Sequence, residues 1–289
     1  MKNSSFTKFR TFCSVAVLAA GLGLGACYFD TSELRLETAK RIATPSFMLH
    51  RNIPAGEFMF TVYERVHEKG KPATIYIEGD GVAWTSKSRK SLDPTPRNPV
   101  ALHLASRDMG PNVIYLARPC QYSWTNTGEA CDDRFWTSDR FAPEVVAAMN
   151  AAVDNIKKKY DISSFNLVGF SGGGAIAALL TAERDDVVSL RTVAGNLDHD
   201  TLNRMHGVSM MPRSLNPVQV APQIANIPQH HFIGEWDEIV TPAIYDSFRA
   251  AAGPTTCMRS SMVKEVDHET GWVNIWPTLL KAPLDCNKQ

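Results

Sequence analysis

One serine in this 289-residue chain has neighbours suited to a nucleophile, because residues 167–177 read LVGFSGGGAIA. A nucleophilic serine needs an exposed hydroxyl, and a sharp turn from a strand to a helix exposes it by straining its backbone. Such a turn has room only for very small residues two positions before and after the serine, and here they are Gly169 and Gly173. The N–H of Gly172, at the positive end of the following helix, could then bind an oxyanion. Ser171 is therefore a candidate nucleophile.

Two other interpretations of this stretch stay open at this point. The pattern Gly172-x-Gly174-x-x-Ala177 loosely matches a dinucleotide-binding fingerprint, but that motif normally opens the first βα unit of its fold. Here it follows the fourth candidate strand counted from residue 56. A tight turn without any chemistry is the second interpretation. The candidate base and acid decide between these interpretations.

The chain has eight histidines, and the position of His268 fits a general base best. It lies in VDHETGW, after a candidate strand at 261–266, where the carboxyl ends of strands carry functional groups. Two carboxylates could orient it. Asp237, in FIGEWDEIVTP, precedes His268 by one helix and one strand, whereas Asp198, in AGNLDHD, opens a long irregular segment. Position favours Asp237, and Asp198 remains the alternative.

These residues need regular elements to position them. Candidate strands are short, β-branched or aromatic, and bounded by Gly, Pro, Asn or Asp; they cover residues 58–66, 73–79, 112–117, 165–170, 189–195, 229–235 and 261–266. Helical patterns between them cover residues 98–109, 142–159, 173–184, 242–252 and 271–281. Strands that alternate with helices predict an α/β fold, in which a mostly parallel central sheet carries helices on both faces. We expect a single such domain over residues 56–289.

Three of these motifs occur in an order that resembles the α/β-hydrolase superfamily, over roughly residues 56–282. They are the turn at 169–173, the GEWDEIV turn and the DHETGW loop. The resemblance implies that Ser171 is the nucleophile, His268 the general base and acid, and Asp237 the orienting carboxylate. It also implies acyl transfer through an acyl-serine intermediate, with water as the usual acceptor.

The family places a second oxyanion donor in the loop after the strand at 73–79, which here reads EGDGVAW. The backbone N–H groups of Asp80 and Gly81 are the candidates, beside that of Gly172. Many family members have His-Gly-Gly in this loop, and Glu78 stands where that histidine would be. A carboxylate near a developing oxyanion would repel it, so we expect the Asp80 side chain to point away and cap the turn.

The substrate is only broadly indicated by the sequence. Residues 118–140 form a long aromatic segment of the kind that covers functional sites, and Trp124 and Trp136 could line an acyl or aromatic pocket or belong to the core. Ester, thioester, lactone and amide substrates are not distinguished, and a small-molecule, lipid or glycan ester is expected. An acyltransferase of the same fold and a non-catalytic binding lipoprotein remain alternatives. Nothing in the sequence indicates an oligomeric state.

The first 26 residues are predicted to be a signal peptide, because a basic segment precedes a short apolar run that ends in small residues. The sequence Leu24-Gly25-Ala26-Cys27 resembles the lipobox of bacterial lipoproteins, which implies cleavage before Cys27 and attachment of lipid to its sulfur. An ordinary signal peptide with a chance cysteine is the alternative. Tyr28 replaces the aspartate that retains lipoproteins at the inner membrane, which favours an outer-membrane anchor facing the periplasm. Residues 27–55 are predicted to be the lipidated N-terminus and a tether.

Four cysteines remain after this processing, and an even number in an oxidising compartment predicts two disulfides, for which three pairings exist. We expect Cys120–Cys131, which closes a short loop in the aromatic segment, and Cys257–Cys286, which ties the C-terminus to the strand before His268. No His/Cys cluster suggests a metal, and no cofactor is expected. A net charge of zero without a basic stripe argues against nucleic acid as a partner.

Overall fold

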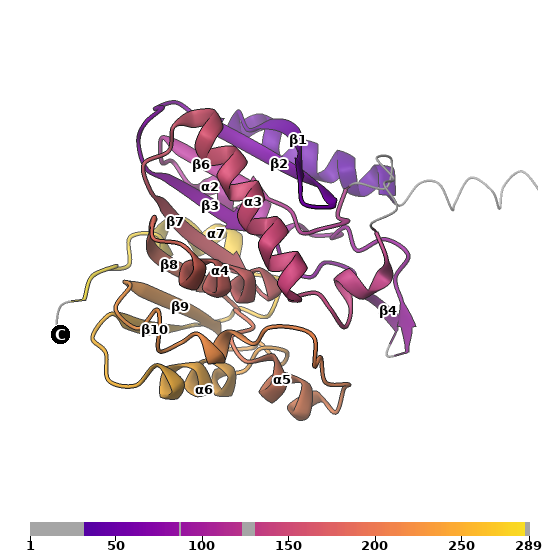
Figure 1. Cartoon of the computed structure of the whole chain (residues 1–289), viewed down its shortest axis with the longest axis vertical. Coiled ribbons are helices and arrows are strands. Elements are labelled where there is room, and N and C mark those ends of the chain that lie inside the picture. Colours follow the sequence, from indigo (N-terminus) through magenta and orange to yellow (C-terminus); the bar gives the residue numbers. More distant parts are fainter. Residues whose placement is uncertain (1–31, 87, 123–130, 287–289) are drawn as a thin grey trace, which may run out of the picture.

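The computed structural model describes residues 32–86, 88–122 and 131–286, and the structural statements below concern these residues. An eight-stranded sheet with the order β1-β2-β6-β3-β7-β8-β9-β10 forms the centre (Figure 1). Strand β2 is antiparallel to β1 and β6, and all other neighbouring pairs are parallel. The strands are β1 (Leu49–Ala55), β2 (Phe58–Val66), β3 (Ala73–Ile77), β6 (Asn112–Leu116), β7 (Phe165–Phe170), β8 (Val187–Val193), β9 (Gln229–Gly234) and β10 (Met258–Val263). A small hairpin pairs β4 (Trp84–Ser86) with β5 (Arg89–Lys90).

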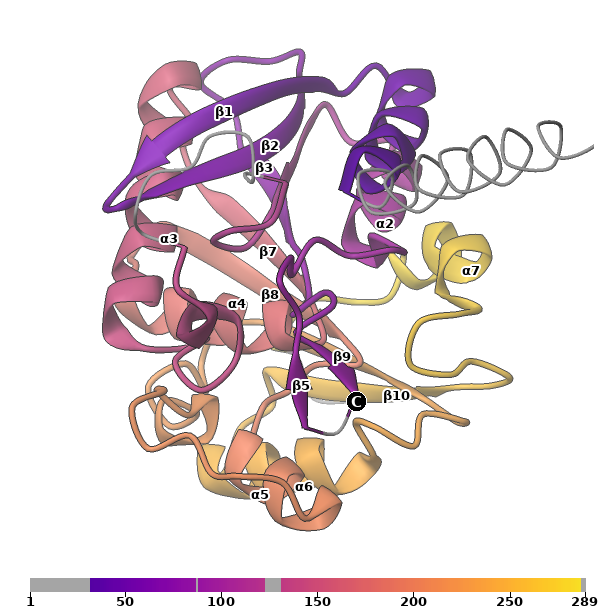
Figure 2. The ribbon, with the colours of Figure 1, turned by 90° about the vertical axis from the view of Figure 1, so that its right-hand side faces the viewer.

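Helices cover both faces of this sheet. The α-helices are α2 (Val100–Arg107), α3 (Pro143–Tyr160), α4 (Gly172–Glu183), α5 (His199–His206), α6 (Pro242–Ala252) and α7 (Trp272–Leu279), and residues 32–43 are also helical. Short 3-10 turns are η1 (Thr44–Ser46), η2 (Asp133–Trp136) and η3 (Pro217–Gln219). One hydrophobic cluster lies under α3, α4 and α6, and a second lies under α2, α7 and the helix at 32–43. Figure 2 shows α3 and α4 on one side of the sheet and α2 and α7 on the other.

The central strands are buried on both faces, which explains their composition. All five residues of β6 (NVIYL) are buried, and β3 (ATIYI) is nearly so. Parallel strands covered on both faces are apolar throughout rather than alternating. Each buried Val, Ile or Leu side chain contributes about 1.5–3 kcal/mol through removal of apolar surface from water. These strands therefore hold their carboxyl ends rigidly in register.

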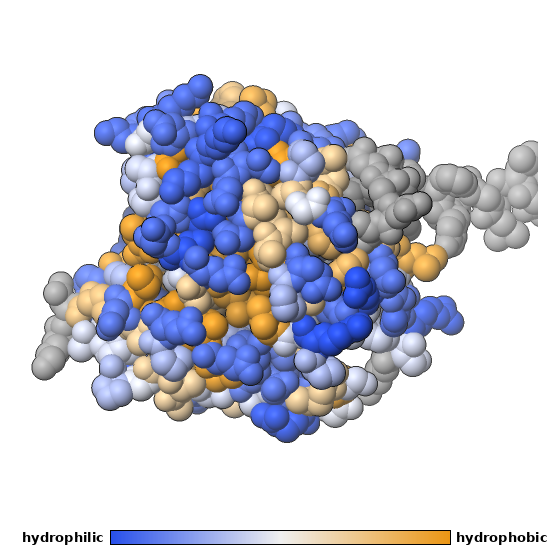
Figure 3. All heavy atoms as spheres, in the orientation of Figure 1, coloured by the Kyte–Doolittle hydropathy of each residue, from blue (hydrophilic) through white to orange (hydrophobic). Residues whose placement is uncertain are grey.

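Two helices beside β7 differ in how they pack. Helix α3 starts with Pro143 and buries a face that includes Val146, Met149, Val153 and Ile156, whose spacing of three to four residues is that of an amphipathic helix. In contrast, the first ten residues of α4 are all buried. On the face that α3 and α4 share, hydrophilic residues dominate and hydrophobic residues gather in a band across the middle (Figure 3). Because its first ten residues are all buried, helix α4 is a central element of the fold.

The predicted α/β architecture is confirmed, with small shifts in the bounds. The seven predicted strands and five predicted helices are present, and the largest differences concern the last strand, predicted at 261–266 and found as Met258–Val263. Helix α5 was not predicted; it forms inside the irregular segment after β8, where Asp198 caps its first turn.

The packed structure begins earlier than the predicted boundary at residue 56. Residues predicted to form a tether instead include the helix at 32–43, in which Ala39 and Ala43 are fully buried, and the edge strand β1. A two-residue turn with Gly56 at φ +56° joins β1 to β2, a conformation that favours glycine. Residues 1–31, including the predicted signal peptide and Cys27, lie outside the described residues.

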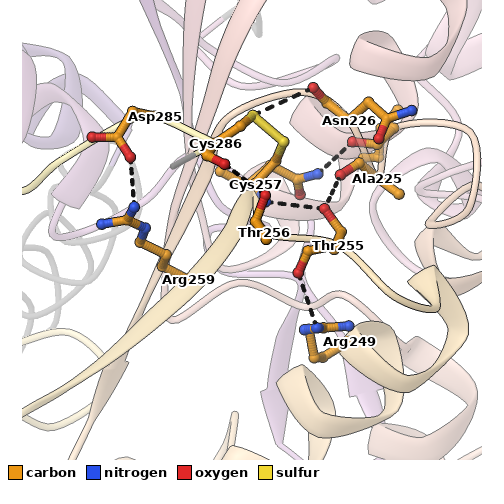
Figure 4. Close-up of a disulfide and its surroundings, with 11 residues drawn as sticks. Ala225, Asn226, Arg249, Thr255, Thr256, Cys257, Arg259, Asp285 and Cys286 are labelled. Atoms are coloured by element: carbon orange, nitrogen blue, oxygen red, sulfur yellow. Dashed lines mark hydrogen bonds and ion pairs between the residues drawn. A yellow bond between two sulfur atoms is a disulfide. The ribbon is translucent and has the colours of Figure 1, made fainter. Parts of the chain in front are cut away.

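Both predicted disulfides are present. Cys120 pairs with Cys131, and Cys257 pairs with Cys286. The second bond fastens the C-terminal segment beside the edge strand β10 (Figure 4), where the Thr256 hydroxyl also donates to the carbonyl of Cys286 at 2.6 Å. Within the described ranges, no helix combines the length and the apolar character needed to cross a membrane. In the same ranges, no group of three or more His, Cys, Asp or Glu side chains could hold a metal ion.

Candidate active site

Ser171 occupies a strained turn between β7 and α4. Its φ of +50° and ψ of −120° lie where L-amino acids rarely occur, and such a conformation costs on the order of 1–3 kcal/mol. Backbone hydrogen bonds hold it there: the N–H of Ser171 donates to Val193 (3.0 Å), and its carbonyl accepts from Gly174 and Asn196 (2.9 Å each). The carboxyl ends of β7 and β8 therefore fix the serine.

Glycine is required around this turn for steric reasons. A Cβ on Gly169 would lie 2.2 Å from the carbonyl oxygen of Gly173, and one on Gly173 would lie 2.2 Å from that of Ile77. A Cβ on Gly172 would lie 2.1 Å from Oδ1 of Asp80, whereas real Cβ atoms essentially never approach within 3.0 Å. The first two clashes match the spacing argument from the sequence. The third was not anticipated.

The structure brings Ser171, His268 and Asp237 together. Nε2 of His268 lies 3.0 Å from Oγ of Ser171, and Nδ1 lies 2.9 Å from Oδ2 of Asp237. The Asp237 side chain is fully buried, and its Oδ1 accepts the N–H groups of Ile239 and Val240 at 2.8 Å each. Asp237 follows β9 and His268 follows β10, so adjacent parallel strands place the pair.

The partners of the His268 ring indicate its tautomer. A carboxylate only accepts, so Nδ1 carries the proton that faces Asp237, and Nε2 is left to accept the proton of the Ser171 hydroxyl. The ring also lies against Phe170, with 5.4 Å between ring centroids, and the His268 carbonyl accepts from the indole N–H of Trp272 at 3.1 Å. These contacts hold the imidazole in an orientation suited to a general base.

Asp198, the alternative acid, forms its hydrogen bonds with residues other than His268. It caps α5, and its carboxylate accepts from Thr201, from the amide of Asn216 (2.9 Å) and from the hydroxyl of Ser247 (2.6 Å). Burial raises its pKa, but the hydrogen bonds from Ser247, Thr201 and Asn216 outweigh burial and lower the pKa to about 2. The geometry therefore assigns Asp198 to stabilising the segment after β8.

The loop after β3, residues 78–82, also lies beside Ser171, because β3 is a neighbour of β7 in the sheet. Gly81 has φ +63°, and a Cβ there would lie 2.0 Å from the carbonyl oxygen of Pro94, so only glycine fits. The Asp80 carboxylate does not point away as expected. It packs against Gly172 and faces the guanidinium groups of Arg118 (3.2 Å) and Arg140 (3.4 Å). Neither arginine was identified from the sequence, because both lie in a long segment without periodicity.

Glu78 is the second unusual carboxyl group in this loop. It is 1% exposed; its Oε1 accepts the N–H groups of Gly79 (2.8 Å) and Ala101 (3.4 Å). Its Oε2 has no hydrogen-bond partner within the described part of the chain. Burial raises the pKa of Glu78 from 4.5 to about 7, although the backbone N–H groups oppose the rise. A carboxyl group with this pKa is partly protonated at neutral pH.

A pocket of about 280 Å³ opens beside Ser171 and His268. The remaining lining residues come from the loop after β3, the segment before α2, the end of β7 and the segments after β9 and β10: Glu78, Asp80, Gly81, Val82, Pro96, Arg97, Asn98, Phe170, Ile239 and Glu269. Trp136 is absent from this lining; it packs in the core cluster under α3, and its indole N–H donates to Ser91 at 3.2 Å. Trp124 lies outside the described residues.

The order and the directions of the strands define the class of fold. The chain has the α/β-hydrolase fold, in agreement with the sequence-based expectation. Among solved structures, it is similar to the esterase Pf2001 of Pyrococcus furiosus, with a TM-score of 0.58 and 12% identity over 83% of this chain and 91% of the other.

Two further structures are similar over most of their length. A membrane phospholipase A, described as a bacterial virulence factor, gives a TM-score of 0.54 at 14% identity, covering 93% of this chain and 94% of its own. Est1E from Butyrivibrio proteoclasticus gives 0.54 at 13%, covering 80% and 96%. No protein-family model and no curated protein sequence matches the chain. At these identities the likeness shows the fold, and function must be argued from the site.

Proposed function

We propose that this protein is a serine hydrolase that cleaves a carboxylic ester or a related acyl bond. The observation that carries the proposal is the hydrogen-bonded series Ser171–His268–Asp237 on a strained turn beside a pocket. Nucleophile, base and orienting carboxylate are the three parts that acyl transfer by a serine requires. An esterase and a phospholipase A are among the similar structures, which supports an ester as the substrate.

The reaction would proceed in two steps. In the first, Oγ of Ser171 attacks the acyl carbon while Nε2 of His268 takes the hydroxyl proton, and Asp237 stabilises the resulting imidazolium. The oxyanion accepts hydrogen bonds from the N–H of Gly172 and from the loop after β3, at Asp80 or Gly81. His268 then donates its proton to the leaving alcohol. In the second step, water attacks the acyl-serine with His268 again as base, and the acid is released.

The pocket constrains the size of the group that binds beside Ser171. Its volume of about 280 Å³ is slightly below the roughly 300–1,000 Å³ of typical small-molecule sites. Val82, Pro96 and Ile239 supply apolar wall, whereas Arg97 and Glu269 supply charge of both signs. We therefore expect short acyl groups to be preferred over long ones.

We also propose that the protein is an exported lipoprotein held at the outer membrane. The two disulfides support an oxidising compartment. Ser32 donates to the Asp93 carboxylate at 2.6 Å, and that residue belongs to the segment that supplies Arg97 to the pocket. Ser32 lies five positions after Cys27, so the two residues are at most about 18 Å apart. A lipid on Cys27 would therefore keep the pocket close to the membrane, within reach of esters there.

Labelling with a fluorophosphonate tests the catalytic proposal. The probe should modify wild-type protein at Ser171 and leave Ser171→Ala unlabelled, while both proteins give the same circular dichroism spectrum. Hydrolysis of a panel of p-nitrophenyl esters should fall by several orders of magnitude in the variant. Product analysis with and without an added alcohol separates hydrolysis from acyl transfer to an alcohol. Unchanged hydrolysis by Ser171→Ala would overturn the proposal.

A further inference from the structure

The Asp80 carboxylate lies where a negative charge should impede the proposed reaction. Its backbone N–H is a candidate oxyanion donor, and its Oδ1 would lie only 2.1 Å from a Cβ placed on Gly172, the other candidate donor. The side chain is largely buried, so water screens its charge poorly. An uncompensated carboxylate here would oppose the negative charge that develops on the substrate oxygen in the transition state.

Two arginines face this carboxylate, one at each oxygen. Nη1 of Arg118 lies 3.2 Å from Oδ1 of Asp80, and Nη1 of Arg140 lies 3.4 Å from Oδ2. Arg118 is 4% exposed, and burial lowers its pKa to about 10, although Asp80 opposes the change, so it is charged at neutral pH. The two guanidinium groups and the carboxylate together carry one net positive charge beside the candidate oxyanion donors.

The same arginines are held rigidly. Both guanidinium groups lie over the ring of Phe141, at 5.2 and 5.5 Å from its centroid. The Arg118 guanidinium also donates to the backbone carbonyl of Arg140. The backbone N–H of Arg118 donates to the side-chain oxygen of Gln121 at 3.0 Å. The Gln121 side-chain amide in turn donates to the carbonyl of Gly79 at 2.9 Å. This hydrogen bond connects the turn after β6 to the loop after β3.

We propose that Arg118 and Arg140 are positioning residues of the oxyanion site, an inference that rests on the proposed hydrolase function. They neutralise Asp80 and fix its carboxylate against Gly172, so that the backbone N–H groups at both positions point at the reacting oxygen without an opposing charge. The arginines act through Asp80 and contact no substrate themselves. Removing Arg118 leaves Asp80 with Arg140 alone and abolishes the net positive charge beside the oxyanion donors, and removing the carboxylate as well restores that charge.

A double-mutant cycle on a soluble p-nitrophenyl ester tests the proposal. Arg118→Gln should lower kcat by about 100-fold, the size of effect found when one oxyanion donor is lost, with KM within about threefold of wild type. Asp80→Asn alone should lower kcat less than Arg118→Gln does. The variant Arg118→Gln/Asp80→Asn should regain at least about tenfold of the lost kcat, because Arg140 then restores the single net positive charge that the cluster carries in the wild type. A purely structural role for Arg118 predicts that the second substitution gives no recovery.

Arg184 provides a matched control. It is also a buried arginine in an ion pair, with Asp186 at 2.7 Å, but it lies at the amino end of β8, away from the pocket. Arg184→Gln should lower the melting temperature without changing kcat. Should Arg118→Gln fail to fold, the same cycle is run with Arg140→Gln, whose side chain is less buried.

The outcomes separate this inference from the proposed function. Loss of kcat in Arg118→Gln and recovery on adding Asp80→Asn support it. A kcat for Arg118→Gln within threefold of wild type, or no recovery in the double variant, overturns it while Ser171-dependent hydrolysis stands. Hydrolysis that does not depend on Ser171 overturns the proposed function and this inference together.

Discussion

Replacing Glu78 by glutamine tests how the buried carboxyl group beside the candidate active site affects the stability of the fold. Burial raises its pKa from 4.5 to about 7. The ionisable groups that act on it include Arg118, Tyr115 and Tyr122. Burial raises the pKa values of both tyrosines well above 10, so they stay neutral between pH 5 and pH 8. Over this range, the charges of these three groups therefore stay constant while Glu78 titrates.

The sign of the effect follows from the direction of the pKa shift. The unfolded chain loses the Glu78 proton near pH 4.5, whereas the folded protein keeps it until about pH 7. The favourable contribution of the protonated side chain is thus complete below pH 4.5 and is lost as the pH rises through 7. At about 1.4 kcal/mol per pH unit, the full loss is about 3 kcal/mol. Because glutamine does not titrate, the stability advantage of Glu78→Gln should grow by about 2.5 kcal/mol from pH 5 to pH 8.

Urea unfolding followed by tryptophan fluorescence at pH 5, 6, 7 and 8, with the disulfides intact, measures this advantage. Glu64→Gln is the matched control, because Glu64 is also buried. Burial raises the pKa of Glu64, but hydrogen bonds from Arg51, Lys159 and Tyr160 outweigh burial and lower it. Its charged form therefore stabilises the fold throughout this pH range, and Glu64→Gln should lose a constant amount. An advantage of Glu78→Gln that is equal at all four pH values would refute the reasoning.

Three further predictions concern the proposed site and the disulfides. Asp237→Asn should lower kcat/KM on a short ester by about 10⁴-fold because the His268 tautomer is no longer fixed, whereas Asp198→Asn should stay within about tenfold. The reverse ranking would move the acid to Asp198. Gly172→Ala should lower kcat by about 100-fold, because its Cβ would lie 2.1 Å from a carboxylate oxygen at the oxyanion site. Wild-type kinetics in that variant would contradict the packing described. Cys257→Ser/Cys286→Ser opens a loop with a sequence separation of 29 and should lower the free energy of unfolding by about 3.5 kcal/mol in a urea titration, with kcat unchanged. An unchanged urea midpoint would argue against this bond.

The positions of Ser171, Asp237 and His268 could be predicted because each depends on local sequence. Glycine spacing encodes the turn at Ser171, and alternation of strands with helices places Asp237 and His268 at the carboxyl ends of parallel strands. The choice between Asp237 and Asp198 rested on chain order alone. The structure adds the physical reason, because the hydrogen bonds of Asp198 are already used in capping α5.

Features that depend on distant segments could not be predicted. Arg118 and Arg140 lie 38 and 60 residues from Asp80, in a segment whose pattern predicts no regular element. Strand β1 reads LHRNIPA, and its proline and polar residues fit an edge strand but give no alternating signal. The helix at 32–43 did have a usable signal, since Ala39 and Ala43 are four residues apart and both are buried.

Several features that lower the stability of the fold lie at the proposed active site. Ser171 is held in a conformation that costs on the order of 1–3 kcal/mol. Glu78 is a buried carboxyl group, and Asp80 with its two arginines forms a buried ionic cluster of the kind that apolar residues could replace without loss of stability. A protein that only bound a partner through this fold would not need a strained serine, nor would it need buried charges beside the candidate oxyanion N–H groups. Their coincidence at the carboxyl ends of β3, β6 and β7 favours acyl-transfer chemistry over a binding role, because such local conflicts are expected where function opposes stability.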